Sequence, residues 1–234
     1  TGSDCLYLRD PRTGERRQGA YADIVDAVRL CDALPNIDFV MSMLIPWDVP
    51  PAVSDRYQMQ AMLLHTSKPV VFVPHDGAGC ADCVEMALAI AGGPAELELN
   101  PFICCYVNVA APLRHNRESV ERLFYMAERG LPCIYFGPIL RGLSGPMTVL
   151  GSMVLANAGQ LAGLVMAQLV REGAPVIRGQ TMGGPVDMRY LVNLLGAPER
   201  TRGTTDLAHF YGLPIFGQSG YTEAKVFDEQ AAME

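Results

Sequence analysis

A chain of 234 residues, half of them apolar and 18% charged, has the composition of a globular protein with a substantial core. The formal net charge is −7 and the isoelectric point is near 5.1, which argues against a phosphate-binding surface and hence against nucleic acid as a partner. Seven cysteines, several of them inside apolar runs, are typical of reduced core thiols in the cytoplasm. The chain starts without Met and stops inside a helix-like run, so we expect a fragment.

The first part of the chain predicts a β-hairpin followed by alternating helices and strands. The hairpin spans about residues 5–20, because Asp10-Pro11-Arg12-Thr13-Gly14 has Pro and Gly where a turn needs them. A helix then carries Ile24, Val28 and Cys31 on one face and is stopped by Pro35. The following segments are predicted as a strand at 37–45, a helix at 55–64, a strand at 69–73, and a helix at 83–91 closed by glycine.

The second part continues the same alternation. We predict strands at 102–109, 132–136, 175–177 and 213–216, and helices at 118–128, 149–171 and 205–211. Apolar strands that alternate with helices indicate a parallel sheet covered on both faces. The absence of a Gly-x-Gly-x-x-Gly motif disfavours a dinucleotide-binding sheet. The sequence therefore predicts an α/β fold, a (β/α)8 barrel of which about six of the eight units are present, as one domain over residues 1–234.

The segment Val149–Val170 carries no charge over 22 residues, long enough to span a bilayer. Its polar residues Ser152, Asn157, Gln160 and Gln168 share about half of the helical wheel, which lipid would not favour. We therefore expect a buried helix packed closely through small residues, and no membrane association.

Most familiar catalytic sets are absent from the sequence. Neither a Gly-x-Ser-x-Gly elbow nor a His-Glu-x-x-His motif occurs, and no metal site is expected. Cys80 and Cys83 form a CxxC that admits a zinc or redox role, but a pair of buried or loop thiols is the favoured interpretation. His75-Asp76 ends a strand, where barrel sites lie, although a structural histidine is the default.

Aromatic residues at strand ends are the remaining signal. Trp47, Phe136, Phe216 and Tyr221 follow or end predicted strands, and such ends share one rim in a parallel barrel. Aromatic faces at a rim can hold a quaternary ammonium group at about 0.5–2 kcal/mol per ring. Aromatics also simply fill cores, so this pattern alone leaves both interpretations open.

Several segments of the last third resemble one known family. They are Gly145-Pro146-Met147-Thr148, Leu155 to Gly163, Gly173-Ala174-Pro175-Val176-Ile177, His209 to Pro214 and Thr222 to Ala231. Earlier segments, Asp32 to Phe39, Thr66 to Val70 and Ala111-Pro112-Leu113, extend the match. Together they are similar to the trimethylamine methyltransferase family, whose members are barrels about twice this length.

The resemblance implies transfer of a methyl group from a tertiary or quaternary amine to Co(I) of a cognate corrinoid protein. The corrinoid would be carried by that partner, so no cofactor bound directly to the chain is implied. Trimethylamine-specific members carry pyrrolysine at or beside the position of Tyr221, where this chain has ordinary residues. The chain therefore resembles the non-pyrrolysine branch, which includes glycine betaine methyltransferases.

These considerations identify candidate substrate-binding residues and leave alternatives. The candidates are Tyr221, Gln218, Phe216, Gln180, Phe136 and Trp47. The aromatics would face the ammonium methyl groups and the amides would hydrogen-bond the rest of the substrate, while the catalytic residues are not identified. A non-catalytic barrel that binds a methylated amine or docks a partner is the alternative; a tetrapyrrole enzyme that uses Arg141 and Arg178 ranks below it. A homo-oligomer is expected.

Overall fold

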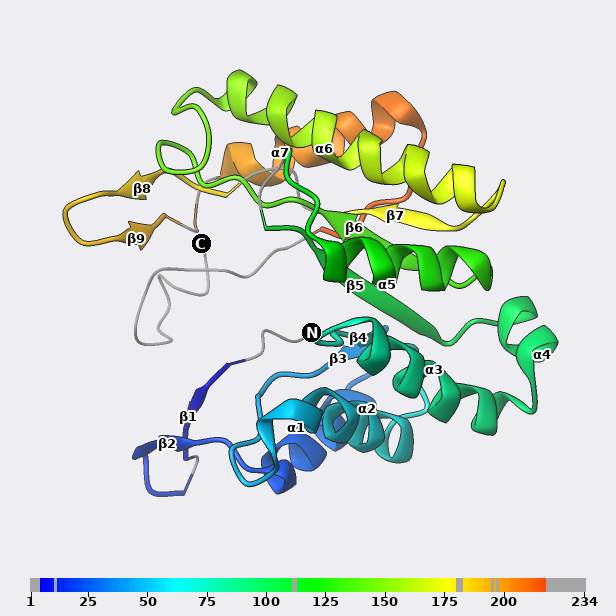
Figure 1. Ribbon diagram of the computed structural model, residues 1–234. Helices are drawn as coiled ribbons and strands as arrows, with labels where there is room; N and C mark the ends of the chain where they lie inside the picture. Colours follow the sequence, from blue (N-terminus) through cyan, green and yellow to red (C-terminus); the bar gives the residue numbers. More distant parts are fainter. Residues whose placement is uncertain are drawn as a thin grey trace. The chain divides into compact units, whose positions relative to one another are not determined.

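The structure is a computed structural model that describes residues 5–10, 12–110, 113–179, 183–194, 196 and 198–217. Its main feature is a parallel sheet in which five strands are hydrogen-bonded in the order β3-β4-β5-β6-β7 (Figure 1). The register pairs Val40 with Val70, Val70 with Ile103, and Cys133 with Val176. The strand order follows the chain order without the reversal that defines a doubly wound sheet. The predicted α/β class is confirmed, and the closed barrel stays a prediction.

The chain divides into two compact units, Thr1–Tyr106 with Tyr125–Pro132, and Val107–Phe124 with Cys133–Glu234. The first unit contains β1 (Tyr7–Arg9), β2 (Arg16–Gln18), α1 (Tyr21–Ala33), β3 (Val40–Met41), η1 (Pro51–Val53), α2 (Ser54–His65), β4 (Val70–Phe72), α3 (Gly77–Ala91) and α4 (Pro94–Leu99). Strand β5 (Ile103–Asn108) and helix α5 (Arg117–Glu128) contribute residues to both units.

The hairpin at the start of the chain is present, and β1 pairs antiparallel with β2. Arg17 on β2 bonds the carboxylates of Asp10 in the turn and Asp23 in the first turn of α1. Asp23 in turn accepts the backbone N–H of Ala20, which closes a capping interaction at the start of α1. The polar residues of this segment therefore fasten the hairpin to the helix that follows it.

The core of the first unit is built from the apolar face of α1, from α2 and α3, and from the strands between them. Ile24, Met59, Met62 and Phe72 are almost completely buried there. The three residues of β4 are all buried, as expected for a parallel strand covered on both faces.

The second unit contains β6 (Cys133–Phe136), α6 (Val149–Val170), β7 (Val176–Arg178), β8 (Val186–Asp187), β9 (Val192–Asn193) and α7 (Pro198–Tyr211). Helix α6 packs on β6 and β7 through Ser152, Ala156, Gly159, Gln160, Gly163 and Ala167, which are its buried residues. A Cβ at Gly163 would overlap the ring of Tyr135, so this position requires glycine for close helix–sheet contact. The predicted role of small residues on this helix is confirmed. The prediction of a buried helix is wrong for the opposite face, where Leu150, Val154, Val165 and Leu169 are exposed, because α6 packs on the sheet through one side only.

The structure differs from the predicted elements at several boundaries. Helix α3 begins at Gly77, earlier than the predicted 83, because Asp76 caps it by accepting the N–H of Gly79. The strand predicted over 37–45 is reduced to Val40–Met41, and that over 213–216 to a single parallel bridge between Arg178 and Ile215. Helix α7 begins at Pro198 rather than 205, and the sequence patterns missed α4 and the short β8–β9 pair.

Candidate functional site

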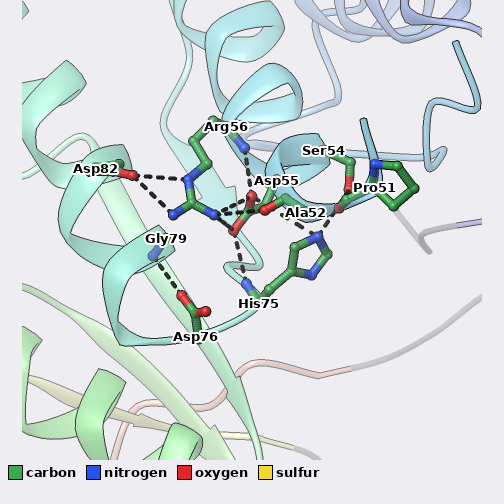
Figure 2. A network of polar contacts seen from close by, with 9 residues as sticks. All are labelled: Pro51, Ala52, Ser54, Asp55, Arg56, His75, Asp76, Gly79 and Asp82. Carbon is green, nitrogen blue, oxygen red and sulfur yellow. Dashed lines mark hydrogen bonds and ion pairs between the residues drawn. The ribbon is translucent and has the colours of Figure 1, made fainter. Parts of the chain in front are cut away.

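A polar cluster lies at the carboxyl end of β4, where the chain leaves the sheet through His75 and Asp76 (Figure 2). The N-terminus of α2 supplies Ser54 and Asp55, whose side chains are turned toward this loop. The carboxylate of Asp55 accepts the backbone N–H of His75 at 2.9 Å, and Ser54 Oγ lies 2.9 Å from His75 Nε2. The strand-end loop is therefore fastened to the start of α2 by two contacts.

Asp55 is a buried carboxylate with a side chain only 1% exposed. Arg56 Nη1 lies 3.0 Å from it, and the same guanidinium reaches Asp82 on α3 at 2.9 Å. Burial lowers the pKa of Arg56, but its hydrogen bonds and charge interactions with the two aspartates outweigh this and raise it overall. The position of Asp55 in the first turn of α2 adds the favourable field of the helix N-terminus.

Gly79 allows this arrangement to form. A Cβ at Gly79 would overlap Asp55 Oδ2 and press against the guanidinium of Arg56, so α3 approaches the pair closely only through glycine. One turn further along α3, burial raises the pKa of the Cys83 thiol, and the nearby Asp55 charge raises it further. A thiol held neutral in this way is not a nucleophile.

The serine, histidine and aspartate do not form a catalytic triad. In a triad the carboxylate bonds the ring nitrogen opposite the one that faces the serine. Here Ser54 Oγ and Asp55 Oδ1 both lie nearest His75 Nε2, at 2.9 and 4.0 Å. Ser54 Oγ also lies 3.1 Å from Pro51 O, so the hydroxyl has two partners within hydrogen-bond distance. The cluster thus holds a half-exposed imidazole against the start of α2.

A second cluster, within the second unit, lies at the carboxyl end of β7. Phe136 ends β6 and packs against Gly179, where a Cβ would overlap the Phe136 ring. Phe216 donates its backbone N–H to Arg178 O at 2.7 Å, and Gln160 of α6 donates its amide to Gly179 O at 3.0 Å. Two of the predicted aromatics therefore both contact the last residues of this strand.

Arg178 places a buried cation beside these residues, with only 4% of its surface exposed. Its Nη2 donates to Asn157 Oδ1 at 2.9 Å, and its guanidinium carbon lies 5.1 Å from the centre of the Tyr211 ring. Among the described residues, Nε and Nη1 have no hydrogen-bond partner. Burial lowers the pKa of Arg178. A guanidinium with two open donors is suited to a carboxylate or another anion.

The space next to Arg178 is small. A cavity of about 10 Å³ is lined by Tyr135, Gln160, Leu161, Leu164, Val176, Arg178 and Leu213. This volume holds about one water molecule and no substrate. A ligand for the open donors of Arg178 would therefore have to reach them from outside this cavity.

Tyr135, which is buried, and His115, which is partly buried, form a further polar pair in the same unit. The Tyr135 hydroxyl bonds His115 Nδ1, and the two rings are nearly parallel with centres 5.9 Å apart. Burial lowers the pKa of His115 and raises that of Tyr135. Both side chains are therefore held neutral near pH 7.

The structure describes only some of the substrate-binding residues predicted from sequence. Gln180, Gln218 and Tyr221 lie outside the described residues. Trp47, in the first unit, is half-exposed; its indole N–H donates to Leu6 O, and its ring lies 6.4 Å from that of Tyr7. The structure thus brings Phe136 and Phe216 to the same strand end, and the substrate role of all six residues stays a prediction.

Other candidates have structural partners. Arg141 pairs with Glu199 at 2.6 Å, which leaves it poorly placed to bind a propionate. Cys80 and Cys83 are both buried in α3, as predicted for core thiols. Among the described residues, no group of three or more His, Cys, Asp or Glu side chains could hold a metal ion. Sequence reasoning noticed His75 but missed Ser54 and Asp55, which look like an ordinary helix start.

A parallel sheet whose strands follow one another in chain order, with helices between them, defines the α/β class of folds. Within that class the family model for trimethylamine methyltransferase matches residues 2–234. The chain belongs to the trimethylamine methyltransferase family.

Curated relatives cover the chain at similar levels of identity. Trimethylamine methyltransferase MttB of Desulfitobacterium hafniense (strain DSM 10664 / DCB-2) is 29% identical over 98% of this chain and 47% of its own length. Glycine betaine methyltransferase of Desulfitobacterium hafniense (strain Y51) is 28% identical over 100% of this chain and 49% of its own length. Trimethylamine methyltransferase MttB of Methanosarcina thermophila is 28% identical over 91% of this chain and 45% of its own length. The chain spans about half the length of these relatives.

Proposed function

We propose that this chain is part of a methyltransferase that moves a methyl group from a quaternary or tertiary N-methyl amine to Co(I) of a corrinoid protein. The observation that carries the proposal is the family match over residues 2–234. The names of the relatives, trimethylamine and glycine betaine methyltransferases, supply the substrate class. The corrinoid acceptor, its partner protein and a location in the cytoplasm are part of the proposal.

The proposed fold is a (β/α)8 barrel that continues the observed winding. Five parallel strands already follow one another in chain order with helices between them, as barrel strands do. In that fold the residues after each strand line the site. Trp47 belongs to the same hypothesis, since it follows the first strand of the sheet.

In this reaction the protein has to bind and orient the amine, and it does not have to supply the nucleophile. The acceptor supplies the nucleophile; the new bond forms at the methyl carbon while the C–N bond breaks and its electron pair goes to nitrogen. A quaternary amine then leaves as a neutral tertiary amine and needs no proton. A neutral tertiary amine would leave as an anion, so it must be protonated first. The chain has an ordinary residue at or beside Tyr221 where trimethylamine-specific members have pyrrolysine, which favours a quaternary, glycine betaine-like donor.

The substrate-binding residues predicted from the sequence suit the binding of such a donor. The faces of Phe136, Phe216 and Tyr221 would hold the methylated cation, at about 0.5–2 kcal/mol per ring. Gln180 and Gln218 would hydrogen-bond the remainder of the molecule. The aromatic rings would exclude water, which would strengthen the cation–π attraction. Their positions would orient the C–N bond toward the nucleophile.

The test is a donor panel with the complete polypeptide that contains this sequence. The protein is mixed with cob(I)alamin or its cognate corrinoid protein and with glycine betaine, tetramethylammonium or trimethylamine, and the loss of Co(I) absorbance is followed. We expect turnover with a quaternary donor, and a loss of at least tenfold in the rate for Tyr221→Ala. Tyr190→Ala is the matched control, because Tyr190 is highly exposed on the second unit. If the folded protein binds the amines but transfers no methyl group, the alternative function, a non-catalytic protein that binds methylated amines, replaces this proposal.

A further inference from the structure

Helix α6 presents a continuous apolar face to solvent, opposite the face that packs on β6 and β7. Every exposed residue of this helix is apolar: Leu150, Val154, Ala158, Ala162, Val165 and Leu169. The four larger side chains are 73%, 70%, 56% and 81% exposed, in chain order. The outward face of a surface helix normally carries charged and polar residues. A stripe of this kind therefore marks a contact surface.

The order of side chains along the stripe is the same from either end: Leu, Val, Ala, Ala, Val, Leu. In a two-fold symmetric contact, residue i meets residue j of the other copy while j meets i. An antiparallel pair of α6 helices would thus bring Val154 against Val165 of the second copy, and Ala158 against Ala162. The small pair at the centre permits close approach, and the large residues fill the space toward both ends.

We propose that α6 is the centre of an antiparallel homodimer interface, in which the exposed stripe of one copy packs on that of another. A second copy fits better than a lipid surface. Helix α6 contains no Lys or Arg, and amphipathic helices that bind membranes carry many on their polar face. Helix α6 also cannot cross a bilayer as placed, although it is long and apolar enough, because its other face is packed. There Ser152 bonds Pro146 O and Gln160 bonds Gly179 O.

The size of the surface indicates what else the interface must include. A helix of 22 residues is about 33 Å long, and a strip about 10 Å wide along it amounts to roughly 330 Å² per copy. Stable interfaces bury about 800 Å² per partner, so the stripe supplies the core rather than the whole. Helix α7 extends it: Phe210 is 77% exposed, and the neighbouring Tyr211 accepts a hydrogen bond from Asn157 of α6.

Cysteine cross-linking tests both the contact and its direction. Val154→Cys and Val165→Cys are made separately with exposed Cys5 changed to Ser, and the two proteins are mixed and oxidised with copper phenanthroline. We expect a cross-linked dimer in the mixture and little in either protein alone. In such a dimer the two copies of Val154→Cys would be separated by 11 residues along the helix axis. That is about 16 Å, beyond the reach of a disulfide. Efficient self-cross-linking of Val154→Cys would overturn the antiparallel contact.

A charge placed on the stripe provides the second measurement. Val154→Lys should weaken the dimer at least tenfold, as measured by sedimentation equilibrium, while Leu143→Lys, at a comparably exposed site of the same unit, should not. Circular dichroism confirms the fold of each variant. A protein that is monomeric at every concentration, or a dimer indifferent to Val154→Lys, would overturn the proposal. A third outcome would also overturn the proposal. If the protein floats with vesicles of anionic and zwitterionic lipid, and Val154→Lys abolishes this binding, lipid rather than a second copy covers the stripe.

Discussion

Replacing Asp55 by Asn tests the physical basis of the cluster in Figure 2. The carboxylate accepts hydrogen bonds from three groups: the backbone N–H of His75, the backbone N–H of Arg56 and the guanidinium of Arg56. An asparagine side chain offers one oxygen and one NH2 group in the same volume. Both oxygens of Asp55 accept hydrogen bonds, so in either orientation the NH2 group of asparagine faces a donor, and at least one of the three donors loses its acceptor.

The cost follows from burial. With asparagine at position 55, the mostly buried guanidinium of Arg56 keeps Asp82 as its one charged partner among the described residues, and the Asp82 side chain is 59% exposed. Breaking a buried pair by removing one partner costs about 3–5 kcal/mol. Asp82→Asn provides a matched control, because it removes a carboxylate from the same guanidinium on the solvent side. Exposed ion pairs contribute about 0–1 kcal/mol, so the two variants should differ by at least about 2 kcal/mol.

Urea unfolding is the assay, and the single tryptophan is well placed to report it. Trp47 belongs to the same unit as Asp55, so its fluorescence follows the region that the substitution perturbs. With slopes of about 1–3 kcal/mol per molar urea, Asp55→Asn should lower the midpoint by about 1 M or more, and Asp82→Asn by a few tenths. Circular dichroism should give the same transitions. Equal losses in the two variants would refute the argument from burial.

Three further predictions concern the second unit. Gly163→Ala should lower the free energy of unfolding by about 1–2 kcal/mol in urea, because overlap with the Tyr135 ring outweighs the better helix propensity of alanine; in a Tyr135→Leu background the same substitution should cost much less. Burial lowers the pKa of His115 below its ordinary 6.5, so the unfolded chain binds more protons there, and stability should fall as pH drops below 6.5. His115→Gln should flatten that pH dependence of the urea midpoint. Arg178→Met should leave thermal stability within about 1 kcal/mol, because it removes a desolvated charge with unpaired donors; a loss above 3 kcal/mol would show a fully partnered guanidinium.

The fold was largely predictable where apolar runs and their punctuation agree. Val70–Phe72 and Cys133–Phe136 are short, buried and bounded by Pro or Gly, so their patterns indicated parallel strands. The start of α3 was not predictable, because Gly77-Ala78-Gly79 is typical of a loop by propensity. Those glycines lie in a helix since Asp76 caps it and Gly79 must approach Asp55. Tertiary contact decided what local propensity could not.

The polar cluster shows the same limit more sharply. Ser54 and Asp55 at a helix start are ordinary residues for that position, so their local pattern has no functional meaning. Their role depends on His75, twenty residues away, arriving at the end of β4. No periodicity or spacing rule connects a helix N-terminus to the loop after the next strand at the level of single atoms. Only the placement of α2 against β4 creates that contact.

Arg178 shows why the chemistry of this chain is hard to infer from residue types. At the end of a strand, an arginine is expected to reach solvent, and the sequence offers nothing to the contrary. It is buried because α6 and α7 close over β7 and bring Asn157 and Tyr211 to the guanidinium. A buried charge with open donors is costly unless something compensates it, and among the described residues Nε and Nη1 of Arg178 have no hydrogen-bond partner. If Arg178→Met keeps the fold but lowers methyl transfer from a carboxylate-bearing donor more than from tetramethylammonium, the guanidinium acts on the donor's carboxylate. Equal losses with both donors would assign it to the shape of the β7 end instead.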